Sequence, residues 1–345
     1  MPQSVEELVQ HNVELRPFNT MDIAARARSF ATVGSMSELH RILDFTKVNK
    51  QDILVLGGGS NILLAGDYRG LVLHMAIKGR EVIRESAEKL WLQIGAGENW
   101  HQTVRYAVEK GWGGIENLSL IPGRVGAAPI QNIGAYGVEL VDVFDELQTV
   151  EISSGKERTF TKEECRFGYR DSIFKHELKG KYAITTVTLQ LHKNPVVNTS
   201  YGAIKTELQQ RGIQEPAIRD ISDIVIDIRN SKLPDPARIG NAGSFFKNPI
   251  IKEAEYEQLK EAFPEMPGYR LGDYKTKVPA GWLIEEAGWK GKVVGNTGTY
   301  RQQALVIVNH GGATADEILQ LARKIRQSVE ERFNIKLVPE VNIID

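Results

Sequence analysis

Three glycines followed by two short polar residues, GGGSN at residues 57–61, form the first segment whose composition suggests ligand chemistry. Glycine leaves backbone amides unhindered, and Ser60 and Asn61 add side-chain donors, so this turn suits an anion such as a diphosphate. The run does not match the dinucleotide fingerprint Gly-x-Gly-x-x-Gly, because Ile62 stands where its last glycine would be. Taken alone, such a run is more often an ordinary turn than an anion site.

A second segment is apolar yet dense in small residues: IPGRVGAAPIQNIGAYG at residues 121–137. Small residues allow close backbone approach, so the segment could line a flat aromatic ligand. Close packing of strands and turns in a core would need the same residues. The composition leaves both interpretations open.

A third segment, GNAGSFFKNP at residues 240–249, places Ser244 in a glycine turn ahead of two phenylalanines. Ser244 could face a cleft and act chemically, although a serine in a turn is most often only a turn residue. No histidine pair has helical metal spacing and no His-Glu-x-x-His motif occurs, so the sequence predicts no metal site.

The elements around these segments alternate strands and helices, which predicts an α+β fold. Strands are expected at residues 52–56, 70–73, 90–94, 187–191 and 305–308, with a hairpin at 147–155 and a strand end at 337–341. Helices are expected from the capping-box spacing of Ser35 and Glu38, at residues 100–108, 253–263 and 280–287, and after the second capping box at Thr314 and Glu317. The prolines at 234 and 236 suggest a domain boundary.

Length and charge exclude several classes of protein. A chain of 345 residues predicts two or three cooperating units, and 43 basic against 44 acidic residues give no global field for nucleic acid or an anionic membrane. The single cysteine, Cys165, excludes an internal disulfide and predicts a small buried residue. We see neither a basic-then-apolar leader nor an apolar run of about 18 residues, so we expect a cytoplasmic protein.

With these segments in view, the sequence resembles the UDP-N-acetylenolpyruvoylglucosamine reductases, also called UDP-N-acetylmuramate dehydrogenases. The resemblance runs from Asn19-Thr20 to Pro339-Glu340 and includes RFGYRDS at 166–172, KLP at 232–234 and GSFFKNP at 243–249. It implies two FAD-binding α+β subdomains of the vanillyl-alcohol-oxidase type, at residues 1–76 and 77–229. A third, substrate-binding α+β domain at 230–334 and a C-terminal strand at 335–345 that returns to the active site complete the expected chain.

The resemblance also implies the site residues. The catalytic set would be Arg170, Ser244 and Glu340. FAD would lie against Gly57, Gly58, Gly59, Ser60, Asn61, Ile121, Pro122, Gly123, Gly126, Ile133, Ala135 and Tyr136. The sugar nucleotide would lie among Tyr201, Lys232, Asn248, Tyr269, Lys290 and Gln303, with Tyr201 in a loop typical of the longer members. Arg124 occupies a position that varies in the family.

The implied reaction is reduction of UDP-N-acetylglucosamine enolpyruvate to UDP-N-acetylmuramate, a precursor of the bacterial cell wall. NADPH would first reduce FAD, and flavin N5 would then deliver hydride to the enolpyruvyl methylene carbon. Arg170 suits the charge that develops beside the carboxylate, because a guanidinium binds a carboxylate with two hydrogen bonds. Ser244 would protonate the carbanion, and Glu340 would be protonated or water-bridged beside the same carboxylate. We expect a monomer whose partners are these two small molecules.

Three alternatives remain at this stage. A serine hydrolase would use Ser244 as nucleophile, but AGSFF at residues 242–246 is not the Gly-x-Ser-x-Gly elbow. Another FAD-dependent oxidoreductase of the same superfamily would share the flavin segments without the substrate residues. A non-enzymatic flavin or sugar-nucleotide binding protein would keep the fold without the chemistry.

Overall fold

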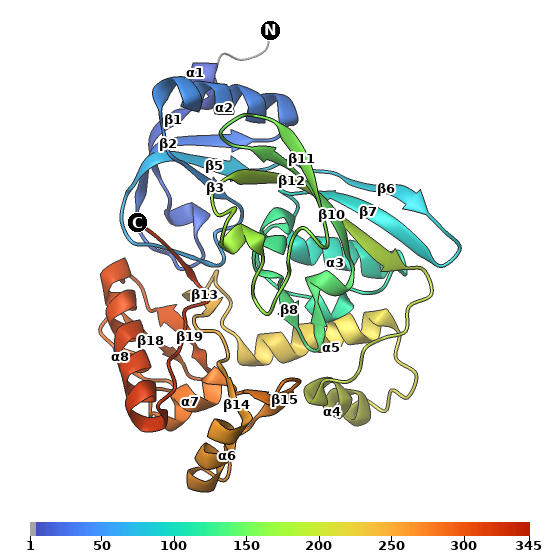
Figure 1. Ribbon diagram of the computed structural model, residues 1–345, viewed down its shortest axis with the longest axis vertical. Coiled ribbons are helices and arrows are strands. Elements are labelled where there is room, and N and C mark those ends of the chain that lie inside the picture. The colour runs from blue at the N-terminus through green and yellow to red at the C-terminus, as the bar shows by residue number, and fades with distance from the viewer. Residues whose placement is uncertain (1–4) are drawn as a thin grey trace. The chain divides into compact units, whose positions relative to one another are not determined.

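The structure, a computed structural model, describes residues 5–345, which form two compact units (Figure 1). Unit 1 contains the described residues up to 14, residues 26–58 and residues 68–229. Unit 2 contains residues 15–25, 59–67 and 230–345. The predicted division into four segments stays a prediction.

A four-stranded sheet with the order β1-β2-β5-β3 forms the first half of unit 1. β2 and β5 are parallel, as are β3 and β5, while β1 is an antiparallel edge strand. Helices α1 and α2 accompany this sheet (Figure 1). The elements are β1 (Gln10–Glu14), β2 (Arg26–Val33), β3 (Ile53–Leu56), β5 (Tyr68–Met75), α1 (Val5–Leu8) and α2 (Met36–Asn49).

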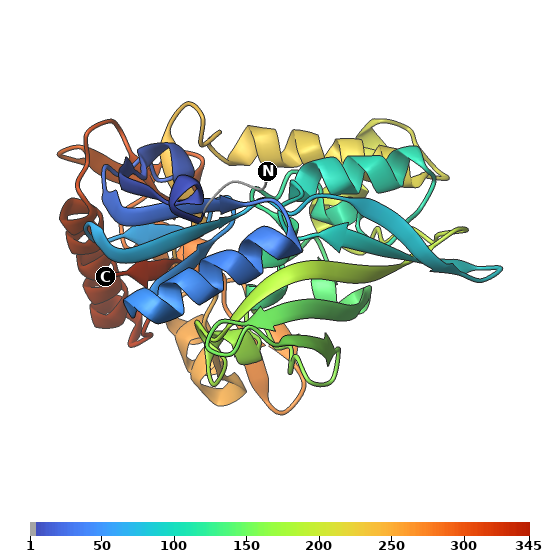
Figure 2. The ribbon, with the colours of Figure 1, turned by 90° about the horizontal axis from the view of Figure 1, so that it is seen from above.

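The second half of unit 1 is a five-stranded antiparallel sheet with the order β11-β10-β12-β7-β6. Its β6–β7 hairpin projects as the cyan ribbon in Figure 2. The elements are β6 (Arg80–Glu85), β7 (Lys89–Gly95), β10 (Phe144–Glu151), β11 (Glu157–Thr161), β12 (Tyr182–His192), α3 (Trp100–Glu109), α4 (Gly202–Gln210) and α5 (Ile218–Lys232), of which residues 230–232 belong to unit 2. Alternate residues of β12, Val187, Leu189 and Leu191, are fully buried, which confirms the strand predicted from their period of two.

Helix α5 was not predicted, although its signal is in the sequence. Ile221, Ile224, Val225 and Ile228 follow helical spacing, and they pack with Ile204 and Leu208 of α4 in a small apolar cluster. The α2 capping box was predicted only half correctly. The Ser35 hydroxyl accepts the Glu38 amide at 3.2 Å, but the Glu38 carboxylate accepts the amide of Gly34 instead of that of Ser35.

Unit 2 is built on an antiparallel sheet with the order β13-β19-β18-β17 and on two helices, α7 and α8. Figure 1 shows α8 alongside β18 and β19, and the predicted capping box of Thr314 and Glu317 begins this helix. The elements are β13 (Gly240–Ser244), β17 (Val293–Val294), β18 (Thr297–Tyr300), β19 (Gln303–Asn309), α7 (Ala280–Glu286) and α8 (Ala315–Phe333). Phe245, Phe246 and Phe333 are among the largest fully buried side chains of its core.

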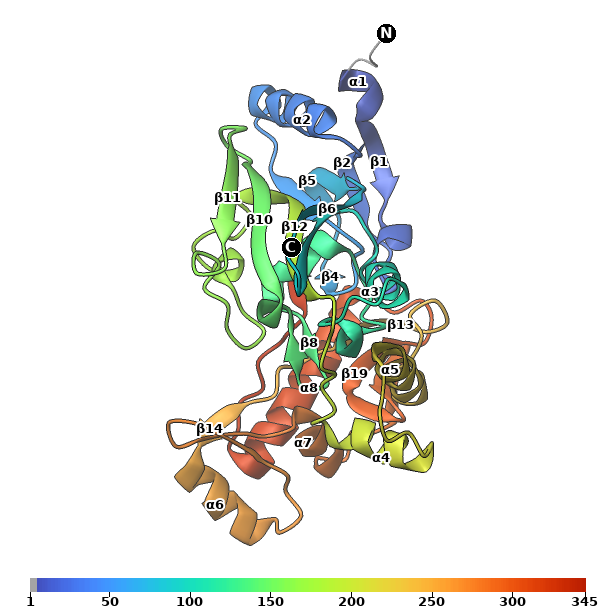
Figure 3. The same cartoon turned by 90° about the vertical axis from the view of Figure 1, so that its right-hand side faces the viewer.

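Two smaller sheets complete unit 2. β14 (Ile250–Lys252), β16 (Lys275–Lys277) and β15 (Tyr269–Leu271) form the first, in that order, next to α6 (Glu253–Ala262) (Figure 3). β20 (Asn342–Ile344) pairs in parallel with β4 (Ile62–Leu64) to form the second. The strand expected at residues 337–341 is therefore wrong in position, because the chain begins pairing as a ladder only at Asn342 and makes an isolated bridge from Pro339 to Phe246.

Candidate functional site

The glycine run follows the last residue of β3, and its first two glycines lie against the small-residue segment within unit 1. A Cβ on Gly58 would be 3.0 Å from Cα of Gly123, and one on Gly57 would be 3.4 Å from Cβ of Arg124. The amides of Gly57, Gly58 and Gly59 donate no hydrogen bond to any residue from 5 to 345. The turn therefore presents backbone donors, the property predicted from its composition.

The end of the same run belongs to unit 2. Gly59 has a φ of +60°, and a Cβ there would lie 2.0 Å from the carbonyl oxygen of Phe18, so only glycine fits. Asn61 Nδ2 donates to the backbone oxygen of Glu340 at 3.3 Å, and the Asn342 amide donates to Asn61 O at 3.0 Å. Asn61 and Glu340, both predicted site residues, thus lie side by side.

The small-residue segment at 121–137 forms short 3-10 turns followed by a hairpin of β8 (Gly134–Ala135) and β9 (Val138–Glu139). A Cβ on Gly126 would lie 2.6 Å from Cβ of Ala96, so glycine is required for the backbone approach. Tyr136 and Gly137 both have positive φ, 51° and 82°, as a two-residue hairpin turn needs. Among the other predicted flavin residues, Ile133 is buried, Ile121 and Ala135 pack against the unit 1 core, and Pro122 is exposed.

Arg170 lies at the tip of a tight loop in unit 1 and is held against this hairpin. Gly168 and Asp171 exchange both backbone hydrogen bonds at 3.1 Å, which closes the loop around Tyr169 and Arg170. Arg170 Nη2 donates to the carbonyl oxygen of Gly134 at 2.5 Å, and its Nη1 lies 4.0 Å from Glu139 Oε1. The Arg170 guanidinium therefore contacts the segment that is predicted to line the flavin.

Asn132 and Glu139 support that loop, and sequence reasoning missed both. Buried Asn132 donates from Nδ2 to Glu139 Oε2 at 2.9 Å and to Gly168 O at 3.1 Å, and its Oδ1 accepts the Val141 amide at 3.0 Å. These contacts tie the two ends of the hairpin to the base of the Arg170 loop. The only local sign is that an asparagine tolerates the φ of 43° found at Asn132.

Ser244 and Glu340 lie on neighbouring backbone segments of unit 2. Ser244 ends β13 opposite Val306, after an irregularity in the pairing that contains Gly243 at φ +70°. The next residue, Phe245, accepts the amide of Glu340 at 2.9 Å. The Ser244 hydroxyl is half-buried and has no hydrogen-bond partner within residues 5–345, so it is available as a donor.

Two predicted substrate residues each lie beside the first turn of α7. Asn248 Oδ1 accepts the amide of Ala280 at 2.9 Å, and a Cβ on Gly281 would lie 2.8 Å from Gln303 Oε1. The other residues of unit 2 are more exposed. Lys290 forms an ion pair with Glu285 at 2.7 Å, Tyr269 is 55% exposed on β15, and Lys232 is exposed at the end of α5.

Tyr201 belongs to unit 1, where it precedes α4 and meets Tyr136. The two rings are 5.1 Å apart in an edge-to-face arrangement. Burial, with the Tyr201 hydroxyl nearby, raises the pKa of Tyr136 although Arg229 opposes the shift, and burial lowers the pKa of Arg229. Arg229 also donates to the carbonyl oxygen of Leu120 at 3.3 Å. No local pattern in the sequence pointed to Arg229.

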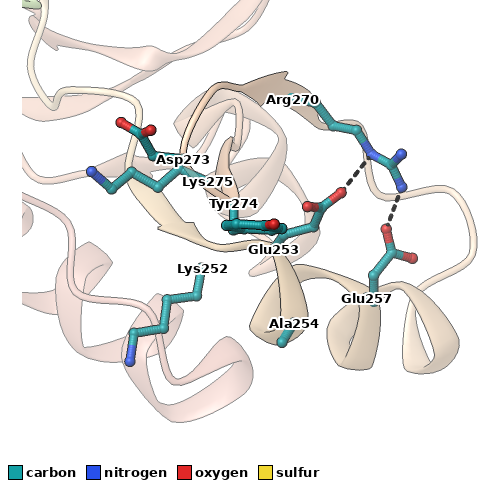
Figure 4. Close-up of a pocket in the computed structure, with 8 residues that line it drawn as sticks. All are labelled: Lys252, Glu253, Ala254, Glu257, Arg270, Asp273, Tyr274 and Lys275. Atoms are coloured by element: carbon teal, nitrogen blue, oxygen red, sulfur yellow. Dashed lines mark hydrogen bonds and ion pairs between the residues drawn. The ribbon is translucent and has the colours of Figure 1, made fainter.

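A hollow on the α6 side of unit 2 is a separate feature (Figure 4). It lies beside the small sheet that carries Tyr269, and Figure 4 shows Arg270 turned toward Glu253 and Glu257 of α6. Those ion pairs measure 3.0 and 2.9 Å, so the guanidinium is already neutralised. No predicted site residue lines this hollow.

Comparison with known proteins identifies the family. The FAD binding domain model matches residues 27–161, and the model for the UDP-N-acetylenolpyruvoylglucosamine reductase C-terminal domain matches residues 235–344. Curated proteins of that name are similar over 97% of this chain: 48% identical in Flavobacterium johnsoniae, 52% in Amoebophilus asiaticus (each covered to 99%) and 45% in Pseudomonas aeruginosa (covered to 98%). The chain belongs to the UDP-N-acetylenolpyruvoylglucosamine reductase family.

A solved structure of this family agrees with the architecture. The UDP-N-acetylenolpyruvylglucosamine reductase of Thermus caldophilus superposes with a TM-score of 0.69 at 25% identity, covering 98% of this chain and 99% of that one. Together with the FAD binding domain, this confirms the predicted α+β fold class of the vanillyl-alcohol-oxidase type.

The residues present fit an FAD molecule. The domain match includes both the glycine run and the small-residue segment, and the unused amides of Gly57 and Gly58 offer hydrogen bonds to a diphosphate. Residues 5–345 contain no group of three His, Cys, Asp or Glu side chains that could hold a metal ion, and the expected lack of a metal site stays a prediction. No helix in that range is long and apolar enough to cross a membrane.

Proposed function

We propose that this chain reduces UDP-N-acetylglucosamine enolpyruvate to UDP-N-acetylmuramate with NADPH through FAD, in the synthesis of peptidoglycan precursors. The observation that carries the proposal is that one chain holds both the FAD binding domain and the reductase C-terminal domain, at 43–52% identity to reductases over nearly its full length. All three predicted catalytic residues are present. Bound FAD supplies the carrier that accepts hydride from NADPH and passes it to the substrate.

Arg170 binds the carboxylate of the enolpyruvyl group in this proposal. Its guanidinium is fixed by Gly134 and faced by Glu139, so it is oriented before substrate arrives. A fixed, charged donor stabilises negative charge that develops at the carboxylate, and it needs little reorganisation to do so. Glu139 acts through Arg170 and is a positioning residue.

Ser244 donates the proton that completes the reaction. Its hydroxyl is unused within the described chain, and its backbone is fixed by β13 and by the Phe245–Glu340 contact. An alcohol is a weak acid, so position must compensate for acidity. Glu340 shares the carboxylate site as a neutral acid or through water, because two carboxylates in contact would repel each other.

The remaining predicted residues recognise the sugar nucleotide. Asn248 and Gln303, near α7, and the exposed Tyr269 supply hydrogen-bonding groups, while Lys232 and Lys290 supply positive charge for the diphosphate. Tyr201 closes over the substrate from its position beside Tyr136. We further propose a monomeric, cytoplasmic enzyme, which sedimentation and cell fractionation would check.

An anaerobic absorbance experiment tests the function. Purified protein is given NADPH and then UDP-N-acetylglucosamine enolpyruvate, and flavin absorbance is followed after each addition. We expect bleaching followed by recovery. Bleaching without recovery would identify a flavoprotein with another substrate, while a colourless protein that takes up no FAD would refute the proposal.

A further inference from the structure

Two cationic side chains of unit 1 meet beside the start of the glycine run. Lys78 Nζ and Arg124 Nη1 donate to the same carbonyl oxygen, that of Gly97, at 2.6 and 2.9 Å. The two charged groups can be no further apart than the sum of these distances. Like charges held this close repel each other, so the arrangement favours an anion nearby.

The first carbons of the Arg124 side chain lie beside Gly57, whose amide donates no hydrogen bond within residues 5–345. Cβ and Cγ of Arg124 are the atoms that a Cβ on Gly57 would meet, at 3.4 and 3.5 Å. His74 lies on β5 directly opposite Leu56, the residue before Gly57. Burial lowers the pKa of His74, and the charges of Arg124 and Lys78 lower it further, as expected if both cations face this end of the sheet.

One carboxylate faces this cluster, and it is mainly used by another arginine. Glu98 Oε2 lies 2.7 Å from Arg80 Nη2 and 3.9 Å from Lys78 Nζ. Lys78 and Arg80 therefore share the Glu98 carboxylate, and within residues 5–345 no carboxylate pairs with Arg124. The surplus is positive, and the unused amides of Gly57 and Gly58 belong to the run whose Gly57 packs against the Arg124 side chain.

We propose that Arg124 and Lys78, together with the amides of Gly57 and Gly58, bind the diphosphate of FAD. This rests on the proposed function, because it assigns that flavin's diphosphate to named side chains. Lys78 and Arg124 would neutralise the negative charge of the diphosphate, which the backbone amides alone offset only in part. By resemblance Arg124 is only a position that varies in the family, and no local pattern in the sequence indicates Lys78.

The test is FAD binding by flavin-free protein, measured by titration calorimetry and by quenching of flavin fluorescence. Arg124→Gln should weaken FAD binding about tenfold and the half-exposed Lys78→Gln about threefold, by loss of a charge-assisted contact to the diphosphate. Riboflavin, which lacks the diphosphate, should bind all forms equally. Arg124→Lys should recover part of the loss.

Arg69→Gln is the matched control. Arg69 is exposed on β5, five residues before His74 and thus about 16 Å along the strand, so its loss should leave FAD binding unchanged. If both cluster variants bind FAD as the unmodified protein does, the inference is wrong while the proposed function stands. Equal weakening for FAD and riboflavin would instead show a structural role at Gly97, and it would also overturn the inference. Unmodified protein that binds no FAD would refute both proposals.

Discussion

Arg170 in unit 1 and Ser244 in unit 2 are positioned in opposite ways. The Arg170 side chain itself is held, by the carbonyl of Gly134 and the facing carboxylate of Glu139. Ser244 is held by its backbone, through β13 and the contact from Phe245 to Glu340, while its hydroxyl stays unpaired within residues 5–345. A group that stabilises charge benefits from a fixed orientation, whereas a proton donor must keep its hydrogen free for the substrate.

We expect the largest effect on the reaction from a substitution of Ser244. Ser244→Ala removes the proton donor without touching the backbone contacts, so reoxidation of reduced flavin by substrate should fall about 10³-fold. Reduction of flavin by NADPH should be unchanged. Stopped-flow absorbance of the two half-reactions measures both rates. Equal loss in the two half-reactions would remove Ser244 from the proton-donor role.

Replacement of Arg170 should have the next largest effect. Arg170→Met should slow reoxidation by substrate about 10²-fold, because a fixed donor to the developing charge is lost. Arg170→Lys should lie between Met and the native residue, since an ammonium cannot make two parallel hydrogen bonds. Single-turnover rates with the reduced enzyme provide the measurement.

Arg166 offers a matched control for Arg170. It has a similar φ, 46° against 54°, and lies four residues earlier, but its side chain is exposed and pairs with Glu177 at 3.0 Å. Arg166→Met should therefore leave the reoxidation rate unchanged. A loss as large as that of Arg170→Met would mean that the loop, not the Arg170 guanidinium, is what matters.

A substitution of Gly243 tests whether backbone geometry positions Ser244. It has φ +70°, and a Cβ there would meet no atom within 4 Å, so Gly243→Ala introduces backbone strain without a clash. We expect a stability cost of about 1 kcal/mol and a reoxidation rate lower by about tenfold, as Ser244 shifts. Thermal unfolding and the half-reaction rates separate the two effects.

Gly312 provides the control, with φ +71° and equally open surroundings in the same unit. Gly312→Ala should cost similar stability and leave reoxidation intact. If both variants lose activity in proportion to their stability, backbone strain at Gly243 has no special role in catalysis.

The parts of the candidate site differ in how much of them the sequence could predict. The glycine run, the small-residue segment and Ser244 were found because their composition is unusual over a few adjacent residues. The contacts of Asn132 with Glu139 and Gly168 were not, because they depend on tertiary packing and leave no local pattern. The same holds for the pairing of β4 with β20, which joins residues far apart in the chain.

The predictions of secondary structure succeeded and failed for other reasons. The helix after Thr314 was predicted because its capping box and its apolar spacing agree. At Ser35 the same spacing predicted a complete capping box, but the Glu38 carboxylate accepts the amide of Gly34 instead of that of Ser35. Helix α5 was missed although its isoleucines follow helical spacing, so that omission was an error of interpretation rather than a lack of signal.

Cys165, at the base of the Arg170 loop, should have the smallest effect, which is on the pH dependence of the free energy of unfolding. Its carbonyl oxygen accepts the amide of Ile173 at 2.9 Å, it is fully buried, and burial raises the pKa of its thiol to about 12. Above the ordinary thiol pKa of 9.0 the unfolded chain loses this proton while the folded chain keeps it, so the free energy of unfolding must fall as pH rises toward 12. Cys165→Ala lacks this dependence, and the difference between the two proteins should change by about 2 kcal/mol between about pH 8 and 10.5. Urea unfolding across that range measures it, and Arg170-dependent activity at pH 7 should be the same in both. Parallel curves would mean that the thiol ionises in the folded protein, and that the base of the loop is more open than its burial implies.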